Sequence, residues 1–425
     1  MTGKKILDLA KVLYPINRSI TGQGVRDSLN EIRKVVPGLE IVSVPSGTKC
    51  FDWTVPPEWE VSEAYLLGPD GAEILNLRDH NLHVVGYSEP IDINLDLADL
   101  QSHLHSLPDQ PDAIPYITSY YEPRWGFCLT DSKRRSLRPG TYRAVIRSRK
   151  FSGVLNYGEL LIKGKSESEV FLSSYVCHPQ MANNEISGPS VLAYVGQWLQ
   201  SLDNRLSYRL VFVPETIGAI CYLSNNLAEM KNRIIAGFNL TCIGDNRSYS
   251  MIDSRTGNTL ADRVARRVLQ EISNGSFSRY SYLERGSDER QYGSPLVNLP
   301  LVTLCRTKFY EFPEYHTSKD DFSVVTEEGL NGGFEMVRQC IAELELGKRY
   351  VARFPCEPQL GSRHLYPSLG GKRTGFTTEL LLNILAYSDG TYDLRDIADI
   401  CKVELREVEA AAEQLLLAGL IYEAL

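Results

Sequence analysis

The sequence predicts an α/β fold in which a mixed, mostly parallel sheet is flanked by helices, with a small β domain inserted near its start and a winged-helix-like domain at its end. Three observations support this. From about residue 169 onward, strand-length apolar runs alternate with helical periodicity, as in repeated strand–helix–strand units. Between residues 42 and 154 the pattern changes to short alternating runs broken by glycine and proline. After a proline-containing linker come three further helical runs and a short strand.

These changes of pattern divide the chain into three predicted parts. Residues 1–41 and 155–354 form the α/β domain, 42–154 the inserted β domain, and 355–425 the winged-helix-like domain. The α/β domain opens with two helical runs between residues 6 and 36. Its later strands are expected at 170–176, 208–213, 235–243 and 299–304, and its helices at 188–202, 217–227, 259–273 and 327–346. The linker is marked by Pro355, Pro358 and Pro367, with glycines at 361, 370 and 371.

Composition narrows the class of protein. With 425 residues, 43% hydrophobic content and 13 Phe, 23 Tyr and 4 Trp, the chain has enough apolar material for a packed core. A net charge of −8 argues against a protein that coats nucleic acid or an anionic membrane. No apolar run has the length of a membrane span, and residues 1–5 lead into an amphipathic pattern rather than a signal peptide. The nine scattered cysteines form no Cys-x-x-Cys pair, which is typical of reduced thiols in a cytoplasmic protein.

The C-terminal domain has the wrong charge for DNA. Residues 360–425 hold six basic and ten acidic residues, a net charge of −4. The helix in the place of a recognition helix, 404–417, carries one Arg and four Glu. A surface that binds phosphates needs the opposite sign. We therefore expect no nucleic-acid contact from this winged helix, and we expect it to serve as a packing or protein-contact module, including a homo-oligomer contact.

Polar side chains follow successive predicted strands of the α/β domain, at the edge where open α/β sheets bind ligands. His178 follows the first of these strands, Glu215 the second and Asp245 the third, and His316 comes soon after the fourth. Histidine and carboxylate together are ligands that suit zinc. A glutamate at the same edge can act as a general base. The pattern therefore predicts a metal-assisted hydrolytic site.

Each of these residues also has a structural interpretation. A histidine after a strand is often a capping or core residue, Glu215 could favour a helix N-terminus, and Asp245 could belong to an ordinary turn. Glu314 and Asp320 could be solvated loop charges. Cys177 is expected to be a packed thiol rather than a nucleophile, because neighbours on a strand point to opposite faces. The coincidence at successive strand ends favours the site.

The order and spacing of these residues resembles the co-catalytic zinc aminopeptidases of the bacterial leucyl aminopeptidase type. The segment 184–188 (NEISG) looks like the Asp-Asn-x-Ser-Gly turn of that family. The segments 286–288 (GSD) and 298–300 (NLP) resemble its Ser-Asp motif and its Gly-Ile-Pro strand.

A closer resemblance, over nearly the whole chain, is to bacterial aminopeptidase-like proteins that are often found with polysaccharide or natural-product biosynthesis genes. Those proteins carry an inserted β domain and a C-terminal winged helix. The motifs that carry the resemblance are 15–22 (PINRSITG), 114–121 (IPYITSYY), 125–128 (WGFC), 177–179 (CHP), 214–218 (PETIG), 287–292 (SDERQY) and 314–318 (EYHTS).

The resemblance implies a role for each matching position. His178 and Asp245 match the residues that bind one metal, and His316 matches a ligand of the other. Glu215 matches the general base. Two positions depart from the family: Thr216 replaces a ligand glutamate, and Asn184 replaces the bridging aspartate.

These departures reduce the number of anionic ligands. Two dications a few ångströms apart need several carboxylates, so one zinc ion is expected rather than two. We expect it to be bound by His178, Asp245 and either His316 or Glu185. The longer side chain of Glu185 could supply the carboxylate that Asn184 lacks.

A substrate-binding set completes the prediction. Arginine grips carboxylate or phosphate groups with two parallel hydrogen bonds, although each arginine could instead form a structural ion pair. Aromatic residues of the inserted domain could wall a pocket over the sheet edge or belong to the domain's own core. The expected substrate-binding residues are Arg18, Arg124, Trp125, Asp288, Arg290 and Arg306.

We therefore expect a metal-dependent amide or peptide-bond hydrolase of aminopeptidase type that acts on a small peptide-like or amino-sugar-linked metabolite. One alternative is a biosynthetic enzyme that uses the same pocket for other acyl or amide chemistry. Another is a non-catalytic binding or scaffold protein that lost activity with the two departures.

Overall fold

The computed structural model describes residues 2–363, 365 and 376–424. They form two compact units, the first Met1–Lys165 with Glu169–Arg338 and the second Ser166–Ser168 with Gln339–Leu425. Pro367, Gly370 and Gly371 of the predicted linker lie outside the described residues. The boundaries of the inserted domain stay a prediction.

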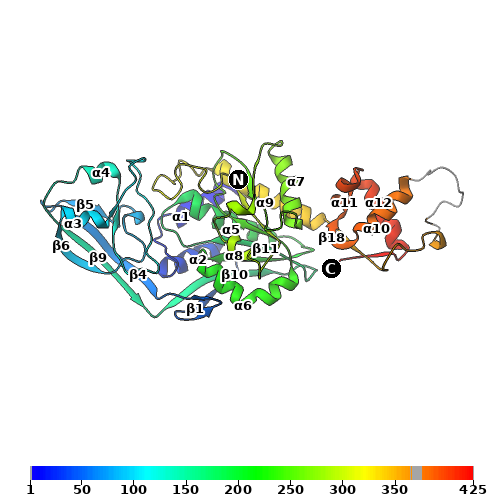
Figure 1. The fold of residues 1–425 in the computed structure, drawn as a ribbon, viewed down its shortest axis with the longest axis horizontal. Helices are drawn as coiled ribbons and strands as arrows, with labels where there is room; N and C mark the ends of the chain where they lie inside the picture. Colours follow the sequence, from blue (N-terminus) through cyan, green and yellow to red (C-terminus); the bar gives the residue numbers. More distant parts are fainter. Residues whose placement is uncertain (1, 364, 366–375, 425) are drawn as a thin grey trace. The chain divides into compact units, whose positions relative to one another are not determined.

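An eight-stranded mixed sheet forms the centre of the first unit, which confirms the predicted α/β class (Figure 1). The order of its strands is β1-β10-β12-β11-β13-β16-β14-β15. The four central strands β12, β11, β13 and β16 run parallel, whereas β1, β10 and β14 add antiparallel pairs. The strands are β1 (Glu40–Pro45), β10 (Val154–Ile162), β11 (Glu169–Tyr175), β12 (Ser207–Val213), β13 (Ile234–Leu240), β14 (Ser250–Ile252), β15 (Ser278–Tyr280) and β16 (Leu301–Cys305).

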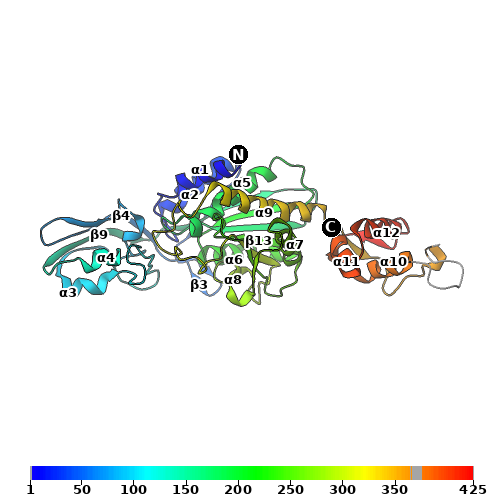
Figure 2. The ribbon, with the colours of Figure 1, turned by 90° about the horizontal axis from the view of Figure 1, so that it is seen from above.

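Helices cover both faces of this sheet (Figure 2). One face carries α1 (Thr2–Leu13), α2 (Gln23–Val35), α5 (Ser187–Leu199) and α9 (Glu327–Leu346). The other carries α6 (Ile217–Arg233), α7 (Leu260–Ile272) and α8 (Glu289–Tyr292). Every residue of β11 and β12 is buried, because a sheet that is covered on both faces leaves no strand residue in water. The carboxyl ends of these strands therefore carry the polar groups.

The segment between β1 and β10 forms its own antiparallel sheet, ordered β5-β4-β9-β6. Its strands are β4 (Glu58–Leu67), β5 (Glu73–Asn76), β6 (Ile91–Asp96) and β9 (Thr141–Phe151), and short elements complete it: β2 (Lys49–Cys50), β3 (Trp53–Thr54), β7 (Leu104–His105), β8 (Phe127–Cys128), α3 (Leu97–Leu100) and α4 (Asp131–Arg135). A stretch of this segment also reaches the α/β domain: Pro115 pairs with Thr317, and the backbone N–H of Tyr116 donates to the carbonyl of His316 (2.9 Å).

The second unit is a winged helix, as predicted. A three-stranded sheet of β17 (Arg349–Ala352), β18 (Asp389–Asp393) and β19 (Ile421–Glu423) packs with α10 (Phe376–Tyr387), α11 (Leu394–Cys401) and α12 (Leu405–Leu417). Its core includes Ile384, Val408 and Leu415, none of which is exposed. None of the described helices has both the length and the apolar character needed to cross a membrane.

Candidate active site

His178 follows β11 and is held by a buried carboxylate. Its Nδ1 lies 2.8 Å from Oε2 of Glu185, and Oε1 of Glu185 accepts the backbone N–H of Cys177 (2.7 Å). The guanidinium Nε of Arg18 lies 3.5 Å from the same Oε1, and neither of these two side chains is exposed. A carboxylate at Nδ1 holds a proton on that nitrogen and fixes the ring so that Nε2 points away from Glu185. The contact with Glu185 therefore fixes the orientation of the His178 ring and leaves Nε2 as the atom that can contact a ligand.

Burial and the contacts between neighbouring side chains shift the pKa values of His178 and Cys177. Burial acts to lower the pKa of His178, but the contacts with Cys177 and Glu185 outweigh it and raise that pKa well above its usual value. Burial raises the pKa of the Cys177 thiol to about 11. Its Sγ accepts the backbone N–H of Glu215 (3.2 Å). Cys177 is thus a packed neutral thiol, as expected.

Glu215 lies on the Nε2 side of the His178 ring. Its Oε2 is 3.7 Å from Nε2 of His178, and burial raises the pKa of the Glu215 carboxyl. The following residue, Thr216, has a φ of 65°, which is unfavourable for a β-branched residue and aims the turn. That turn is secured from α8, because Asp288 Oδ1 accepts the Thr216 N–H (2.7 Å) and Arg290 donates to the Thr216 hydroxyl (2.9 Å). Two predicted substrate-binding residues therefore support the glutamate's turn.

His316 comes from the loop after β16 and meets His178. The two ring centroids are 5.6 Å apart, and Tyr116 from the inserted segment lies 5.1 Å from each of them. His316 has a φ of 56° and stacks on Tyr315 at 3.9 Å. Burial, with a further contribution from His178, lowers the pKa of His316 to about 3. Its ring is therefore neutral and keeps one nitrogen lone pair for a ligand.

Asp245 follows β13 and is committed to hydrogen bonds within the protein. Its two oxygens accept from Thr307 N (2.9 Å), Thr307 Oγ1 (2.7 Å), Arg247 N (2.8 Å) and Asn183 Nδ2 (3.0 Å). A carboxylate has about four lone-pair positions, so this set is full. Asp245 ties together the loops after β11, β13 and β16, and binding a metal would break some of these bonds.

Asp320 corrects one interpretation of the sequence. It is completely buried rather than solvated, and its carboxylate accepts the backbone N–H groups of Asn183 (2.6 Å) and Asn184 (2.8 Å). These are the first turn of a π-helix, Ala182–Ile186, that precedes α5. The N-terminal N–H groups of a helix need acceptors, and Asp320 supplies them. Glu314, in contrast, is partly exposed and forms a two-point ion pair with Arg247 (2.8 Å each).

The predicted zinc ligands are only partly brought together. In the part of the chain that the structure describes, the one group of three metal-ligand side chains with ligand atoms within 4.8 Å is Cys177, His178 and Glu185. Its neutral thiol, its internal hydrogen bond and the adjacent Arg18 favour a hydrogen-bonded cluster over a metal site. His178 Nε2 and the ring of His316 lie outside this cluster. Imidazole nitrogens of this kind suit a zinc ion.

Three of the predicted substrate-binding residues make contacts outside the group of His178, Glu215 and His316. Trp125 stacks on His103 (3.7 Å between centroids) and packs against the core of the inserted sheet, because an indole is stabilised more by apolar contact than by solvent. Arg124 is exposed and donates to the carbonyl of Thr118. Arg306 is buried over Tyr249 and donates to the carbonyls of Ser248 and Gly329, which makes it a structural link between loops.

Thr307 is a site residue that the sequence did not indicate, and Asp320 was interpreted as a solvated loop charge. Tyr116 belongs to the aromatic residues of the inserted domain for which a pocket wall was one of two interpretations. Each acts through a partner distant in sequence, such as Thr307 with Asp245 or Tyr116 with His178. Tyr116 lies within the motif at 114–121 and Asp320 lies two residues after the motif at 314–318, whereas Thr307 lies in neither motif.

Family models match nearly the whole chain. Residues 7–347 match a family described as a domain of unknown function (DUF4910), and residues 348–423 match a winged helix-turn-helix family. A Clostridium acetobutylicum protein is 39% identical over 416 residues, which is 97% of this chain and 95% of that protein. It is named as a candidate polysaccharide biosynthesis protein with an aminopeptidase-like domain.

Solved structures show the same fold. A crystal structure of a candidate peptidase from Clostridium acetobutylicum has a TM-score of 0.84 and 38% identity, and the match covers 100% of this chain and 97% of that one. A zinc aminopeptidase from Bacillus subtilis has a TM-score of 0.58 at 13% identity, with 81% and 94% covered. A peptidase M28 precursor from Shewanella amazonensis has a TM-score of 0.53 at 11% identity, with 84% and 99% covered.

Proposed function

Because the chain belongs to the family of aminopeptidase-like proteins with a C-terminal winged helix, and because its α/β domain has the fold of zinc aminopeptidases, we propose that it hydrolyses an amide bond in a small peptide-like or amino-sugar-linked metabolite. The observation that supports this best is the arrangement of Glu185, His178 and Glu215. A buried carboxylate orients the histidine, and a second carboxylate lies 3.7 Å from the free ring nitrogen.

Glu215 is the general base in this proposal. Its carboxylate takes a proton from the attacking water and passes it to the leaving nitrogen, as a positioned glutamate does in amide hydrolysis. The turn at Thr216, secured by Asp288 and Arg290, holds the carboxylate in place. Asp288 and Arg290 therefore act as positioning residues.

One divalent ion, with zinc as the first choice, is proposed on the Nε2 side of His178. His178 Nε2 and the neutral ring of His316 would hold it, with Glu185 behind His178 as the carboxylate that raises the basicity of the ligand. When bound, such an ion supplies Lewis-acid polarisation of the amide carbonyl. Ligation by Asp245 or Glu185 themselves, which the sequence suggested, would need some of their present hydrogen bonds to break.

The test combines metal analysis with turnover. Protein purified without added zinc is assayed for metal content and for cleavage of a panel of amide substrates, with and without chelator. The proposal expects near-stoichiometric metal and chelator-sensitive cleavage, with turnover falling at least 100-fold in Glu215→Gln. Glu122→Gln, at an exposed glutamate of the same unit, is the control and should keep full turnover. Absence of both metal and cleavage in the folded protein would overturn it.

A second candidate is a biosynthetic enzyme that uses the same pocket for other acyl or amide chemistry. The observation in its favour is the name of the Clostridium acetobutylicum relative, which refers to polysaccharide biosynthesis. The two are separated by the same assay: bound metal without hydrolysis of any amide favours the biosynthetic enzyme.

A further inference from the structure

One nitrogen of the Arg18 guanidinium, Nη2, is buried and has no hydrogen-bond partner among the described residues. Arg18 lies in the loop between α1 and α2, and its guanidinium is completely buried. Its Nε donates to the carbonyl of His178 (2.9 Å), and its Nη1 donates to the carbonyl of Leu13 (2.6 Å) and lies 3.4 Å from Ser28 Oγ. Its Nη2 has no hydrogen-bond partner among the described residues. A buried donor left unpaired costs about 1–3 kcal/mol, so such a group indicates an acceptor that arrives from outside.

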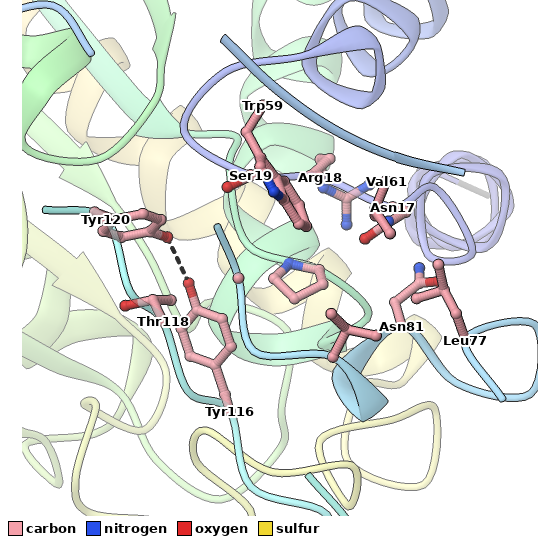
Figure 3. Close-up of a pocket in the computed structure, with 13 residues that line it drawn as sticks. Asn17, Arg18, Ser19, Trp59, Val61, Leu77, Asn81, Tyr116, Thr118 and Tyr120 are labelled. Atoms are coloured by element: carbon pink, nitrogen blue, oxygen red, sulfur yellow. Dashed lines mark hydrogen bonds between the residues drawn. The ribbon is translucent and has the colours of Figure 1, made fainter. Parts of the chain in front are cut away.

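The next residue, Ser19, also has a buried polar atom without a partner in the described part of the chain. This atom is the hydroxyl oxygen, Oγ. Both side chains line one narrow pocket, with Trp59 and Asn17 on one side and Tyr116 and Tyr120 across from them (Figure 3). The pocket has room for about one water-sized group. The wall of a pocket with room for about one oxygen atom thus includes two residues whose buried donors have no partner among the described residues.

A wider groove shares part of its wall with this pocket. It has a volume of about 500 Å³ and shares Asn17, Arg18, Ser19 and Trp59 with the narrow pocket. A groove of this size accommodates a small-molecule ligand. A ligand in the groove can therefore place one terminal oxygen in the narrow pocket while the rest of it remains outside.

The pocket adjoins the candidate active site. Pro179, the residue after His178, forms part of its wall. Tyr116 also lines it, and the ring of Tyr116 lies 5.1 Å from the rings of both His178 and His316. The hydroxyls of Tyr116 and Tyr120 lie 2.8 Å apart, which fixes this wall. A ligand held by Arg18 is therefore close to the residues proposed to react.

We propose that the narrow pocket receives one carboxylate oxygen of the substrate, bound by Nη2 of Arg18 and Oγ of Ser19. Hydrogen bonds between an ionised donor and an ionised acceptor are about twice as strong as neutral ones, and arginine stays charged at all accessible pH values. A carboxylate can place a single oxygen in this space, which has room for about one water-sized group. The identity of this ligand as the substrate rests on the proposed function, and it makes the substrate an amide that also bears an acidic group.

The test uses acetate as the probe and acetamide as its neutral isostere. Titration is followed by NMR of ¹⁵N-labelled arginine side chains in the full-length protein. Acetate is expected to shift the Arg18 signals saturably, and acetamide is expected to bind at least tenfold more weakly. Ser19→Ala, which removes a hydroxyl without a partner, should keep the fold and weaken acetate binding about fivefold or more. Ser62 lines the wider groove but not the narrow pocket, so Ser62→Ala is the matched control and should bind acetate with unchanged affinity.

Several results would overturn the proposal. Acetate binding that is equal in Ser19→Ala and the unaltered protein, or equal for acetate and acetamide, contradicts it. So does a high-resolution crystal structure grown in acetate that shows only a water molecule between Arg18 and Ser19. Glu215→Gln separates the two proposals, because it should bind acetate as tightly as the unaltered protein while losing turnover. Selective acetate binding without any amide cleavage leaves the pocket standing and removes the proposed function.

Discussion

Replacing Glu185 with glutamine tests the central contact of the site. The carboxylate accepts from the Cys177 N–H and the His178 ring and faces the Nε of Arg18 at 3.5 Å, and none of the Arg18 or Glu185 side chain is exposed. Glutamine preserves the shape but removes the charge, so Arg18 loses its buried counter-charge. Removing one partner of a buried ion pair costs about 3–5 kcal/mol. The amide can still accept from Cys177, but its NH₂ then faces Nδ1 of His178, which moves the ring proton to Nε2.

Two measurements check this prediction. Urea unfolding followed by tryptophan fluorescence reports the first unit alone, because Trp53, Trp59, Trp125 and Trp198 all lie in it. We expect Glu185→Gln to lower its free energy of unfolding by about 3–5 kcal/mol. Nitrogen NMR of His178 should show protons on both ring nitrogens in the unaltered protein, whose raised pKa keeps the ring charged, and a neutral ring with its proton on Nε2 in the variant. A loss below about 1 kcal/mol with unchanged protonation of the ring would refute the reasoning, since surface changes alone stay within about 0.5 kcal/mol.

Three further predictions concern packing and pH. Tyr116→Phe removes the hydrogen bond to Tyr120 but keeps the ring over the two histidines, so thermal unfolding should show a loss of about 1 kcal/mol, with a larger loss expected for Tyr116→Ala. Gly188→Ala should destabilise despite the better helix propensity of alanine, because a Cβ would lie 2.6 Å from the carbonyl of Leu240; a more stable variant in urea would contradict this. Burial, with a contribution from His83, lowers the pKa of His80 to about 4, below the usual value near 6.5. The unfolded chain then binds the proton more readily, so stability is lost as pH falls from about 6.5 through 4, by about 2 kcal/mol at pH 5, and urea titrations of His80→Asn should lack this part of the pH dependence.

Long periodic elements were predictable from the sequence. The helix expected at 327–346 has these bounds in α9, because a sustained helical period over many residues is a strong local signal. The helix expected to end at residue 227 continues to Arg233 in α6, since the two asparagines at 225 and 226 look like an ending but are compatible with a packed helix. The strand expected to end at 243 stops at Leu240. Element ends depend on tertiary partners and are the less predictable part.

The candidate site was predictable in its chain positions but less so in its contacts. The sequence indicated His178, Glu215 and His316 at strand ends, and the structure brings them together. The sequence did not indicate that the Asp245 oxygens accept hydrogen bonds from N–H and hydroxyl groups of loops, or that Asp320 caps the π-helix. The contacts of Asp245 with Thr307 and of Asp320 with Asn183 join residues more than 60 positions apart, and one sequence carries no trace of such pairings.

The sequence by itself determined the class of fold, the winged helix and the strand ends that carry polar side chains, because hydrophobic periodicity and charge are local properties of the chain. Only the tertiary structure decided what each polar group does. Glu185 was a candidate ligand in the sequence and is an orienting partner of His178 in the structure, because the π-helix turns it toward Nδ1 and Arg18. Arg18 was one of several arginines and became the one with a buried unpaired donor, since a buried polar atom must find an acceptor and only the assembled surroundings show whether it has.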